Sequence, residues 1–280
     1  MSIGEREAER SGAAEEERVR IEIDGGVAAV TLARPAKHNA LDPAMFEALS
    51  AAIDELGADT SVRAVVLRGE GPSFCSGLDF PSFMVEGGSP VDLFVHREGE
   101  PANNAQRVAY GWRALPVPVI AAVHGACYGG GLQIALGADV RIGAPGTRMS
   151  IMESDYGLIP DMSITQTLAG LVRDDVAREL IYTARKVEAE EAVEIGLLTR
   201  IDEEPVVAAT VLAQEIASRS PDAIRAAKRL VAEGLGASPE KGLALEEELQ
   251  RAIIGKPNQI AAVTAKLSGE PARFSDADGD

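Results

Sequence analysis

The stretch between residues 117 and 136 constrains the fold of this chain more than any other part of the sequence. Residues 117–123 form a mostly apolar run, which predicts a buried strand, and a turn that contains glycine follows. Residues 129–131 are three consecutive glycines at the start of a predicted helix. Because glycine loses more backbone entropy on folding than any other residue, three of them at a helix start need a physical reason.

Close approach of a ligand is one such reason. Without side chains on the first turn, a ligand oxygen can reach backbone N–H groups that lie at the positive end of the helix dipole. Donors of this kind around a reacting carbonyl oxygen form an oxyanion hole. The alternative is a tight strand-to-helix turn that binds no ligand.

Short strands and helices alternate through the first 160 residues. Apolar runs at 19–23 and 27–32 flank Asp24-Gly25-Gly26, which predicts a hairpin. Residues 81–101 are irregular and rich in glycine, and we expect them to be mobile. The other expected elements are helices at 42–56 and 103–115 and strands at 64–68, 117–123, 139–142 and 148–151. This alternation predicts an α/β fold with parallel strands and right-handed crossovers.

The second part of the chain is predominantly helical. Residues 198–201 are its one strand-like segment. Several of the helices begin with the Ser-Pro pattern of an N-cap and a first helical position. The helical periodicity covers residues 163–171, 174–182, 188–195, 204–218, 221–235, 239–254 and 257–267.

The composition argues against several classes of partner. A formal net charge of −17, from 44 acidic and 27 basic residues, disfavours nucleic acid and anionic membranes. No apolar run is long enough to span a bilayer, and residues 1–18 lack the apolar segment of a secretory signal. Cys75 and Cys127 supply neither a disulfide framework nor metal-ligand spacing, so we expect a cytoplasmic protein without a metal site. Residues 1–16 and 275–280 are polar tails that we expect to be disordered.

Four segments resemble the crotonase (enoyl-CoA hydratase/isomerase) superfamily in their order and spacing. They are RPAKHNAL at 34–41, FCSGLD at 74–79, HGACYGGG at 124–131, and GLIPD at 157–161 followed by Thr165 and Gln166. The resemblance implies an α/β fold with a ββα spiral core at 17–200 and a helical trimerisation region at 201–274. It also implies an acyl-CoA substrate and a homotrimer or a dimer of trimers. Coenzyme A would enter as part of the substrate, with no separate cofactor.

The resemblance also implies roles for particular residues. The backbone N–H groups of Leu78 and Gly130 would hold the thioester oxygen. Many relatives carry a Lys-Arg pair near the C-terminus, where this chain has Ser268 and Gly269. This departure predicts weaker contacts with the phosphates of coenzyme A at that place. The residues that would contact coenzyme A are Arg34, Lys37, His38, Ser76, Gly77 and Asp79.

Three residues decide which reaction the resemblance predicts. A typical hydratase of the superfamily uses two glutamates, and this chain has Gln133 at the first position and Glu153 at the second. Glutamine can orient water but cannot carry a proton near neutral pH. Asp161 lies where several isomerases of the superfamily carry an acid. Glu153 and Asp161 as an acid/base pair therefore favour double-bond isomerisation.

Two other functions stay open from the sequence. One is an enoyl-CoA hydratase that uses Glu153 while Gln133 orients the water, and the other is an acyl-CoA-binding protein with little catalysis. Simpler structural roles also exist: Glu153 could pair with Arg148, Asp161 could cap a helix, and Asp79 could brace its loop. The expected apolar pocket would be lined by Phe80, Phe83, Met84, Met152, Leu158 and Ile159.

Overall fold

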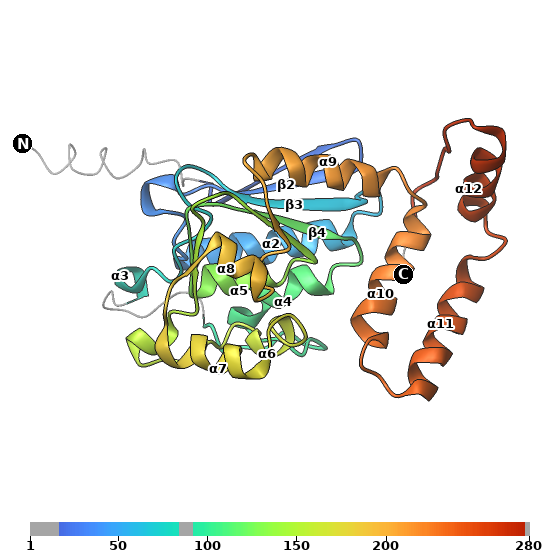
Figure 1. Cartoon of the computed structure of the whole chain (residues 1–280). Coiled ribbons are helices and arrows are strands. Elements are labelled where there is room, and N and C mark those ends of the chain that lie inside the picture. Colours follow the sequence, from blue (N-terminus) through green and yellow to red (C-terminus); the bar gives the residue numbers. More distant parts are fainter. Residues whose placement is uncertain (1–16, 84–91, 278–280) are drawn as a thin grey trace, which may run out of the picture.

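A six-stranded sheet forms the centre of the molecule in the computed structural model, which describes residues 17–83 and 92–277 (Figure 1). Strands β1 and β2 form the predicted hairpin, and the remaining neighbours are parallel. Along the sheet the order is β1 (Val19–Asp24), β2 (Val27–Leu32), β3 (Ala64–Gly69), β4 (Val119–Val123), β6 (Val140–Gly143) and β9 (Arg200–Ile201). The predicted α/β class with parallel crossovers is confirmed.

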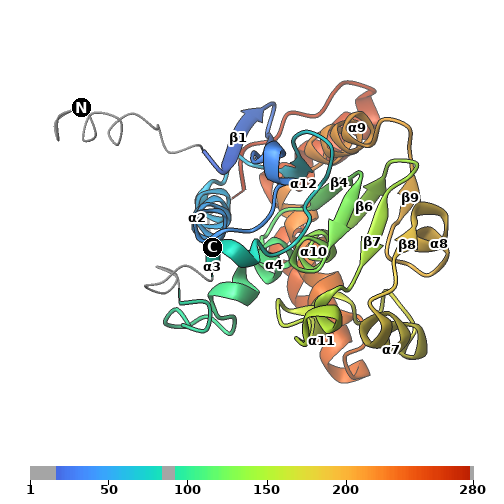
Figure 2. The same ribbon diagram turned by 90° about the vertical axis from the view of Figure 1, so that its left-hand side faces the viewer.

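A second sheet of three short strands lies beside the first and contacts helix α8 (Ala189–Glu194) (Figure 2). Its strands are β5 (Ala126–Tyr128), β7 (Arg148–Ser150) and β8 (Val187–Glu188), with β5 parallel to β7 and β7 antiparallel to β8. The sequence analysis treats residues 124–128 as a turn, and this part of the interpretation is wrong. Three residues between a turn and a glycine run are too few to show strand periodicity.

Helices cover both faces of the large sheet. Helix α9 (Pro205–Ala217) packs on one face through Ala209, Ala213 and Ala217, whose small side chains allow close approach. The other face supports α2 (Pro43–Ala58), α4 (Asn104–Ala114) and α5 (Gly130–Leu136). Residues of β3 alternate between the faces, with Val66 toward α9 and Val65 and Leu67 on the opposite side, as the strand period of two requires.

Short helices connect these layers. Asp42 caps α2 as predicted, because its side chain accepts a hydrogen bond of 2.9 Å from the Met45 N–H. The short helices are a 3₁₀ turn at Pro35–Lys37, α3 (Phe80–Phe83), a 3₁₀ turn at Glu153–Tyr156, α6 (Ile164–Thr167) and α7 (Asp174–Thr183).

Within the segment predicted to be mobile, residues 84–91 lie outside the described residues. Residues 92–101 form turns, and Arg97 there pairs with Asp54 at 2.7 Å.

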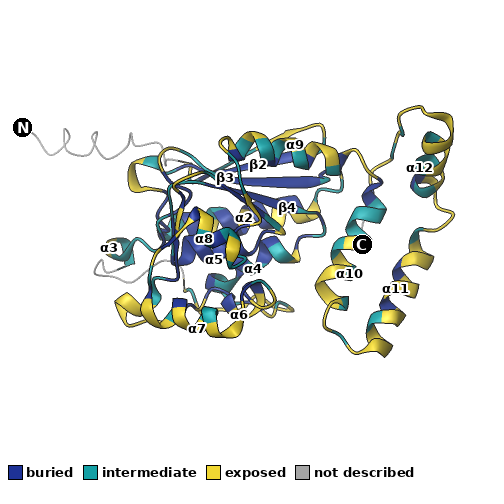
Figure 3. Cartoon of the chain, viewed as in Figure 1, coloured by how far each residue is buried: buried dark blue, intermediate teal, exposed yellow. Residues whose placement is uncertain are grey.

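The last three helices form a group at one end of the sheet, α10 (Pro221–Gly234), α11 (Pro239–Ile253) and α12 (Pro257–Ser268) (Figure 1). Much of their surface is exposed, in contrast to the buried sheet (Figure 3). The buried Lys228 joins α10 to the core: its Nζ lies 2.9 Å from Asp139 Oδ2 and donates to the carbonyls of Trp112 and Val117 at 3.2 and 2.8 Å.

Replacing Lys228 with methionine is expected to destabilise the protein by about 2 kcal/mol. This is below the usual cost of breaking a buried ion pair because Asp139 is partly exposed and keeps its bond with the Val119 N–H. Urea unfolding measures the loss, and hydrogen exchange should show that α10 becomes less protected. Lys241→Met on the exposed surface of α11 is the matched control. Equal unfolding midpoints for the two variants would contradict this role of Lys228.

The chain end returns to the core instead of leaving it at residue 275. The backbone of Ser275 exchanges hydrogen bonds of 3.0 and 3.2 Å with the side chain of Asn258. Arg63 donates to the Phe274 carbonyl at 3.2 Å and pairs with Asp276 at 3.3 Å, and Ala277 is buried. The prediction of a disordered tail from 275 therefore does not hold for residues 275–277.

Residues 17–83 and 92–277 contain neither a membrane-spanning helix nor a cluster of potential metal ligands. None of the helices there combines the length and the apolar character that crossing a bilayer requires. Nor does that part of the chain bring three or more His, Cys, Asp or Glu side chains together as metal ligands would be.

Candidate active site

Strand β5 and the segment at 74–78 place the first proposed oxyanion donor. Phe74 and Cys75 donate to the carbonyls of His124 and Ala126 at 2.8 and 3.1 Å. On the other side, the Leu41 N–H donates to Gly77 at 2.8 Å, and the Asp79 N–H donates to Leu41 at 3.0 Å. Leu78 is therefore held on a short extended segment beside the turn that begins α5.

The backbone N–H groups of Leu78 and Gly130 are both available at this place. Neither makes a hydrogen bond to another of the described residues, and both residues line the same cavity. A Cβ atom built on Gly77, which directly precedes Leu78, would lie 3.7 Å from the Gly130 nitrogen. The two segments thus meet as an oxyanion hole requires.

The glycines at 129–131 have separate reasons for being there. A Cβ atom on Gly131 would lie 2.4 Å from the Cys75 carbonyl oxygen, and one on Gly130 would lie 2.8 Å from Leu41 and Met162 atoms. Gly129 has a φ of 50°, which favours glycine. Internal packing therefore explains Gly131, as the simpler alternative of a tight turn proposes, while Gly130 still offers its N–H to a ligand.

A cavity of about 550 Å³ opens beside this turn. Of the apolar residues expected in it, Phe80, Met152, Leu158 and Ile159 line it. Phe83 instead packs edge to face on Phe46 with ring centroids 6.0 Å apart, and Met84 lies outside the described residues. The lining residues that the sequence analysis did not anticipate are Phe46, Leu93, Phe94, Asn103, Ala105, Gln106, Gly129, Tyr156 and Met162. Most of these lie on segments that approach the cavity only through tertiary packing.

One carboxylate oxygen of Glu153 is buried and has no hydrogen-bond partner among the described residues. This oxygen is Oε2, whereas Oε1 accepts a hydrogen bond of 2.6 Å from Gln133 Nε2. Burial raises the pKa of Glu153, and the negative charge of Asp161 adds to this, against the opposing hydrogen bond from Gln133. The alternative of an ion pair with Arg148 is not seen among the described residues, where Glu153 contacts Gln133 instead.

The Gln133 amide contacts both Glu153 and the backbone of Met162. This side chain is buried, and its Oε1 accepts a hydrogen bond of 2.9 Å from the Met162 N–H. The amide therefore connects α5 to Glu153 and to the backbone just after Asp161. These contacts predict that Gln133 positions Glu153, and the water- or substrate-orienting role expected from the sequence stays a prediction beside it.

Replacing Gln133 with leucine is expected to destabilise the fold by about 2 kcal/mol, because the Met162 N–H loses its buried acceptor. It should also move the acidic limb of the kcat–pH profile to higher pH. The Gln133 hydrogen bond favours the charged form of Glu153, and its loss raises the pKa of that carboxyl further. Urea unfolding and the pH profile measure the two effects. Gln166→Leu, at an exposed position on α6, is the control, and an unchanged profile in Gln133→Leu would argue against the positioning role.

Asp161 lies exposed on the wall of the cavity. It makes no hydrogen bond to the described residues, and α6 begins after Ser163 without a side-chain cap. The alternative of a helix-capping Asp161 is therefore wrong. Its carboxylate is near enough to Glu153 to raise the pKa of that residue.

The residues expected to contact coenzyme A fall into two groups. Arg34 is engaged within the protein, because its Nη1 lies 2.7 Å from Asp79 and its Nε lies 3.3 Å from Asp42. Burial alone would raise the pKa of Asp79, but hydrogen bonds from Arg34 and Ser82 outweigh this effect and lower the pKa. Arg34 and Asp79 therefore brace the loop, which is the simpler of the roles considered for Asp79.

The other expected contacts are differently placed. Ser76 and Gly77 line the cavity, whereas Lys37 and His38 are exposed. The His38 ring nitrogen Nδ1 lies 2.9 Å from the Ser73 hydroxyl. Asn39, which the sequence analysis missed, is buried, and its amide nitrogen donates to the carbonyls of Glu70, Ser73 and Phe74 at 2.8–3.1 Å. The sequence signal for it is an asparagine after Pro35-Ala36-Lys37-His38, since asparagine tolerates the left-handed conformation that Asn39 adopts.

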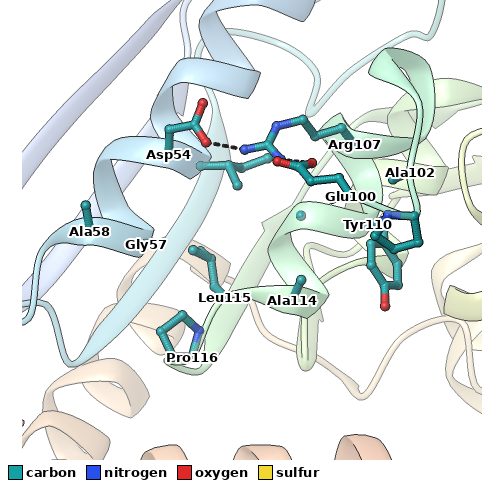
Figure 4. Close-up of a pocket in the computed structure, with 13 residues that line it drawn as sticks. Asp54, Gly57, Ala58, Glu100, Ala102, Arg107, Tyr110, Ala114, Leu115 and Pro116 are labelled. Atoms are coloured by element: carbon teal, nitrogen blue, oxygen red, sulfur yellow. Dashed lines mark hydrogen bonds and ion pairs between the residues drawn. The ribbon is translucent and has the colours of Figure 1, made fainter. Parts of the chain in front are cut away.

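A second cavity, of about 440 Å³, lies between α2 and α4 and contains none of the predicted site residues (Figure 4). Arg107 lies there between Asp54 and Glu100 and pairs with both. Its Nε also donates to the Ser50 hydroxyl at 2.9 Å. These contacts hold the loop before α4 against α2, which makes this charge cluster structural.

Comparisons with known proteins agree with this arrangement. Residues 22–266 match the family described as enoyl-CoA hydratase/isomerase. A mitochondrial methylglutaconyl-CoA hydratase of Mus musculus is 31% identical over 260 residues, which cover 90% of this chain and 81% of the relative. A short-chain-enoyl-CoA hydratase of Clostridium acetobutylicum is 34% identical, over 88% of this chain and 92% of the relative. The crystal structure of an enoyl-CoA hydratase from Mycobacterium tuberculosis H37Rv superposes with a TM-score of 0.83 at 28% identity, covering 94% of this chain and 100% of that one.

Proposed function

The chain belongs to the enoyl-CoA hydratase/isomerase (crotonase) family, and from this premise we propose that it adds water across the double bond of a 2-enoyl-CoA thioester. Membership confirms the resemblance carried by the four sequence motifs and the expected crotonase-like fold. An acyl-CoA substrate follows from the family. The specific reaction is the proposal.

The unpartnered Glu153 Oε2 is the observation that carries the proposal. In the proposed reaction the Leu78 and Gly130 N–H groups stabilise negative charge on the thioester oxygen. Glu153 takes a proton from water as the water oxygen bonds to the β-carbon, and then gives that proton to the α-carbon. The sum is the addition of one water molecule, with Glu153 restored to its carboxylate.

Double-bond isomerisation, which the sequence favours, is the second candidate. Asp161 supports it, because its carboxyl group, when protonated, could deliver a proton to a remote carbon while the Glu153 carboxylate removes one from the α-carbon. The names of the relatives weigh the other way, since several are hydratases. For this reason hydration is the first candidate.

An assay with 2-enoyl-, 3-enoyl- and 3,5-dienoyl-CoA separates the candidates. Hydration predicts loss of absorbance at the conjugated double bond of 2-enoyl-CoA, with turnover abolished in Glu153→Gln and retained in Asp161→Asn. Isomerisation predicts turnover of 3-enoyl- or 3,5-dienoyl-CoA that depends on both acids. Tight acyl-CoA binding without turnover of any of the three would instead support the binding-protein alternative.

Assembly into a trimer or a dimer of trimers is also a proposal. It is supported by exposed apolar side chains on or next to α10–α12, which a partner subunit would cover. These side chains are Val231, Leu235, Leu243, Ile254, Ile260, Val263 and Leu267. Light scattering on the purified chain tests it. The cytoplasmic location expected from the cysteine usage stays a prediction.

A further inference from the structure

The charged side chains of the proposed acyl cavity have one sign. Glu153 and Asp161 line it, and the described lining residues include no lysine, arginine or histidine. A carboxylate on the acyl group would therefore enter a partly desolvated space beside like charges and without a cation to pair with. Like charges in such a place act as a repulsive element that selects against one class of ligand.

The helix terminus at the cavity does not offer an anion site either. The N-terminal turn of α4 borders the cavity, and a helix N-terminus is the usual place for backbone N–H groups to bind an anion. Here these donors are already used. Asn103 and Gln106 satisfy each other's N–H groups with their side-chain oxygens at 3.0 and 2.9 Å, and Asn104 and Ala105 donate to carbonyls of the preceding loop at 3.0 Å.

Apolar side chains continue from the cavity onto the surface. Phe94 and Ile159 line the cavity although they are 72% and 75% exposed. The rings of Phe80 and Tyr156 stack with centroids 4.5 Å apart on the same wall. These residues come from three segments that are separate in the sequence and meet at this cavity. An apolar rim of this kind is stabilised when a hydrocarbon chain covers it.

We propose that the acyl group of the substrate is an uncharged hydrocarbon chain longer than crotonyl, and that the cavity rejects acyl groups ending in a carboxylate. This inference rests on the proposed function in taking the cavity as the acyl site. It separates this chain from the murine relative, whose name specifies methylglutaconyl-CoA, a thioester that carries a free carboxylate.

A matched pair of substrates tests the rejection of charge. Pentenoyl-CoA and glutaconyl-CoA have the same number of acyl carbons and differ in a terminal methyl or carboxylate. We expect kcat/KM to be at least about tenfold higher for pentenoyl-CoA, as like-charge repulsion in a desolvated site implies. Asp161→Asn should reduce this ratio, because it removes one of the two negative charges. A ratio near one, or a preference for glutaconyl-CoA, would overturn the inference.

A second comparison tests the apolar rim. Among crotonyl-, hexenoyl-, octenoyl- and decenoyl-CoA, we expect kcat/KM to rise beyond crotonyl. Phe94→Ser should lower kcat/KM for decenoyl-CoA about tenfold more than for crotonyl-CoA, since it removes apolar cover from the longer chain only. Val211→Ser on α9, which removes an exposed apolar side chain elsewhere, is the control and should not change the ratio. Equal losses for both substrates in Phe94→Ser would contradict the role of the rim.

Binding measurements keep this inference separate from the proposed reaction. If the protein hydrates none of these substrates, the hydratase proposal fails, but calorimetry with pentanoyl-CoA and glutaryl-CoA still reports the charge preference. Tighter binding of pentanoyl-CoA by about tenfold supports the inference without any turnover. Equal or tighter binding of glutaryl-CoA overturns it.

Discussion

Replacing Glu153 with glutamine is expected to lower kcat for hydration by about 10³-fold, the middle of the range for loss of a general acid/base. The amide has nearly the same shape and can still accept the hydrogen bond from Gln133 through its oxygen. It cannot carry a proton, so the α-carbon receives none from this side chain. Stopped-flow absorbance with a 2-enoyl-CoA measures the loss. A variant that keeps a tenth of the activity or more would remove Glu153 from the mechanism.

The same variant should be more resistant to unfolding than the parent protein near neutral pH. Burial raises the pKa of Glu153, so the folded state favours the protonated carboxyl group. The folded protein therefore loses stability as the pH rises from the pKa of Glu153 in the unfolded state through its pKa in the folded state. Glutamine carries no such charge. Urea midpoints should therefore differ at pH ~7 and converge below pH ~4, where glutamate is protonated in both states. This result would also show that lost activity is not lost folding.

Replacing Gly77 with alanine is expected to lower kcat by about 10²–10³-fold, the usual effect of losing one oxyanion donor. Gly77 has a φ of +92°, and an added Cβ would lie 2.9 Å from the Tyr128 carbonyl oxygen and 3.7 Å from the Gly130 nitrogen. The backbone must shift to relieve this contact, and the N–H of the next residue, Leu78, shifts with it. Turnover of a 2-enoyl-CoA and binding of its saturated analogue measure the effect on kcat apart from the effect on affinity.

Gly146→Ala is the control for the backbone strain alone. Gly146 has a φ of +74°, and no atom lies within 4 Å of an added Cβ. Gly146→Ala should lose about 1 kcal/mol of stability from a left-handed alanine, and Gly77→Ala should lose more because its Cβ also meets the Tyr128 carbonyl oxygen. Only Gly77→Ala should lose activity. Equal kcat values in the two variants would show that the Leu78 amide does not stabilise the reacting oxygen.

The sequence predicts the parts of this molecule that depend on local patterns. The hairpin at Asp24-Gly25-Gly26, the capped start of α2 and the glycine turn before α5 all follow from short-range backbone chemistry. The motifs also bring Leu78, Gly130, Glu153 and Asp161 to one cavity. Strand β5 was missed because its three residues gain their order from hydrogen bonds to residues distant in the chain.

The sequence could not predict how side chains share partners. Arg34 is a reasonable phosphate ligand by its type and place, yet the fold directs it to Asp79 and Asp42. Gln133 suggests a water-binding amide, and the fold adds contacts that its type does not reveal, one with Glu153 and one with the Met162 N–H. Such outcomes depend on packing that brings distant segments within hydrogen-bond distance, which no local pattern encodes.

The helices α10–α12 are fastened to the core at both of their ends. Lys228 holds the first helix, and Arg63 holds the returning chain at 274–276. Because these helices are attached to the core at two points, they cannot rotate away from it about a single connection. Exchange of the helices between two copies of the chain would require both sets of contacts to break. Copies of the chain should therefore associate through surfaces already formed in each one.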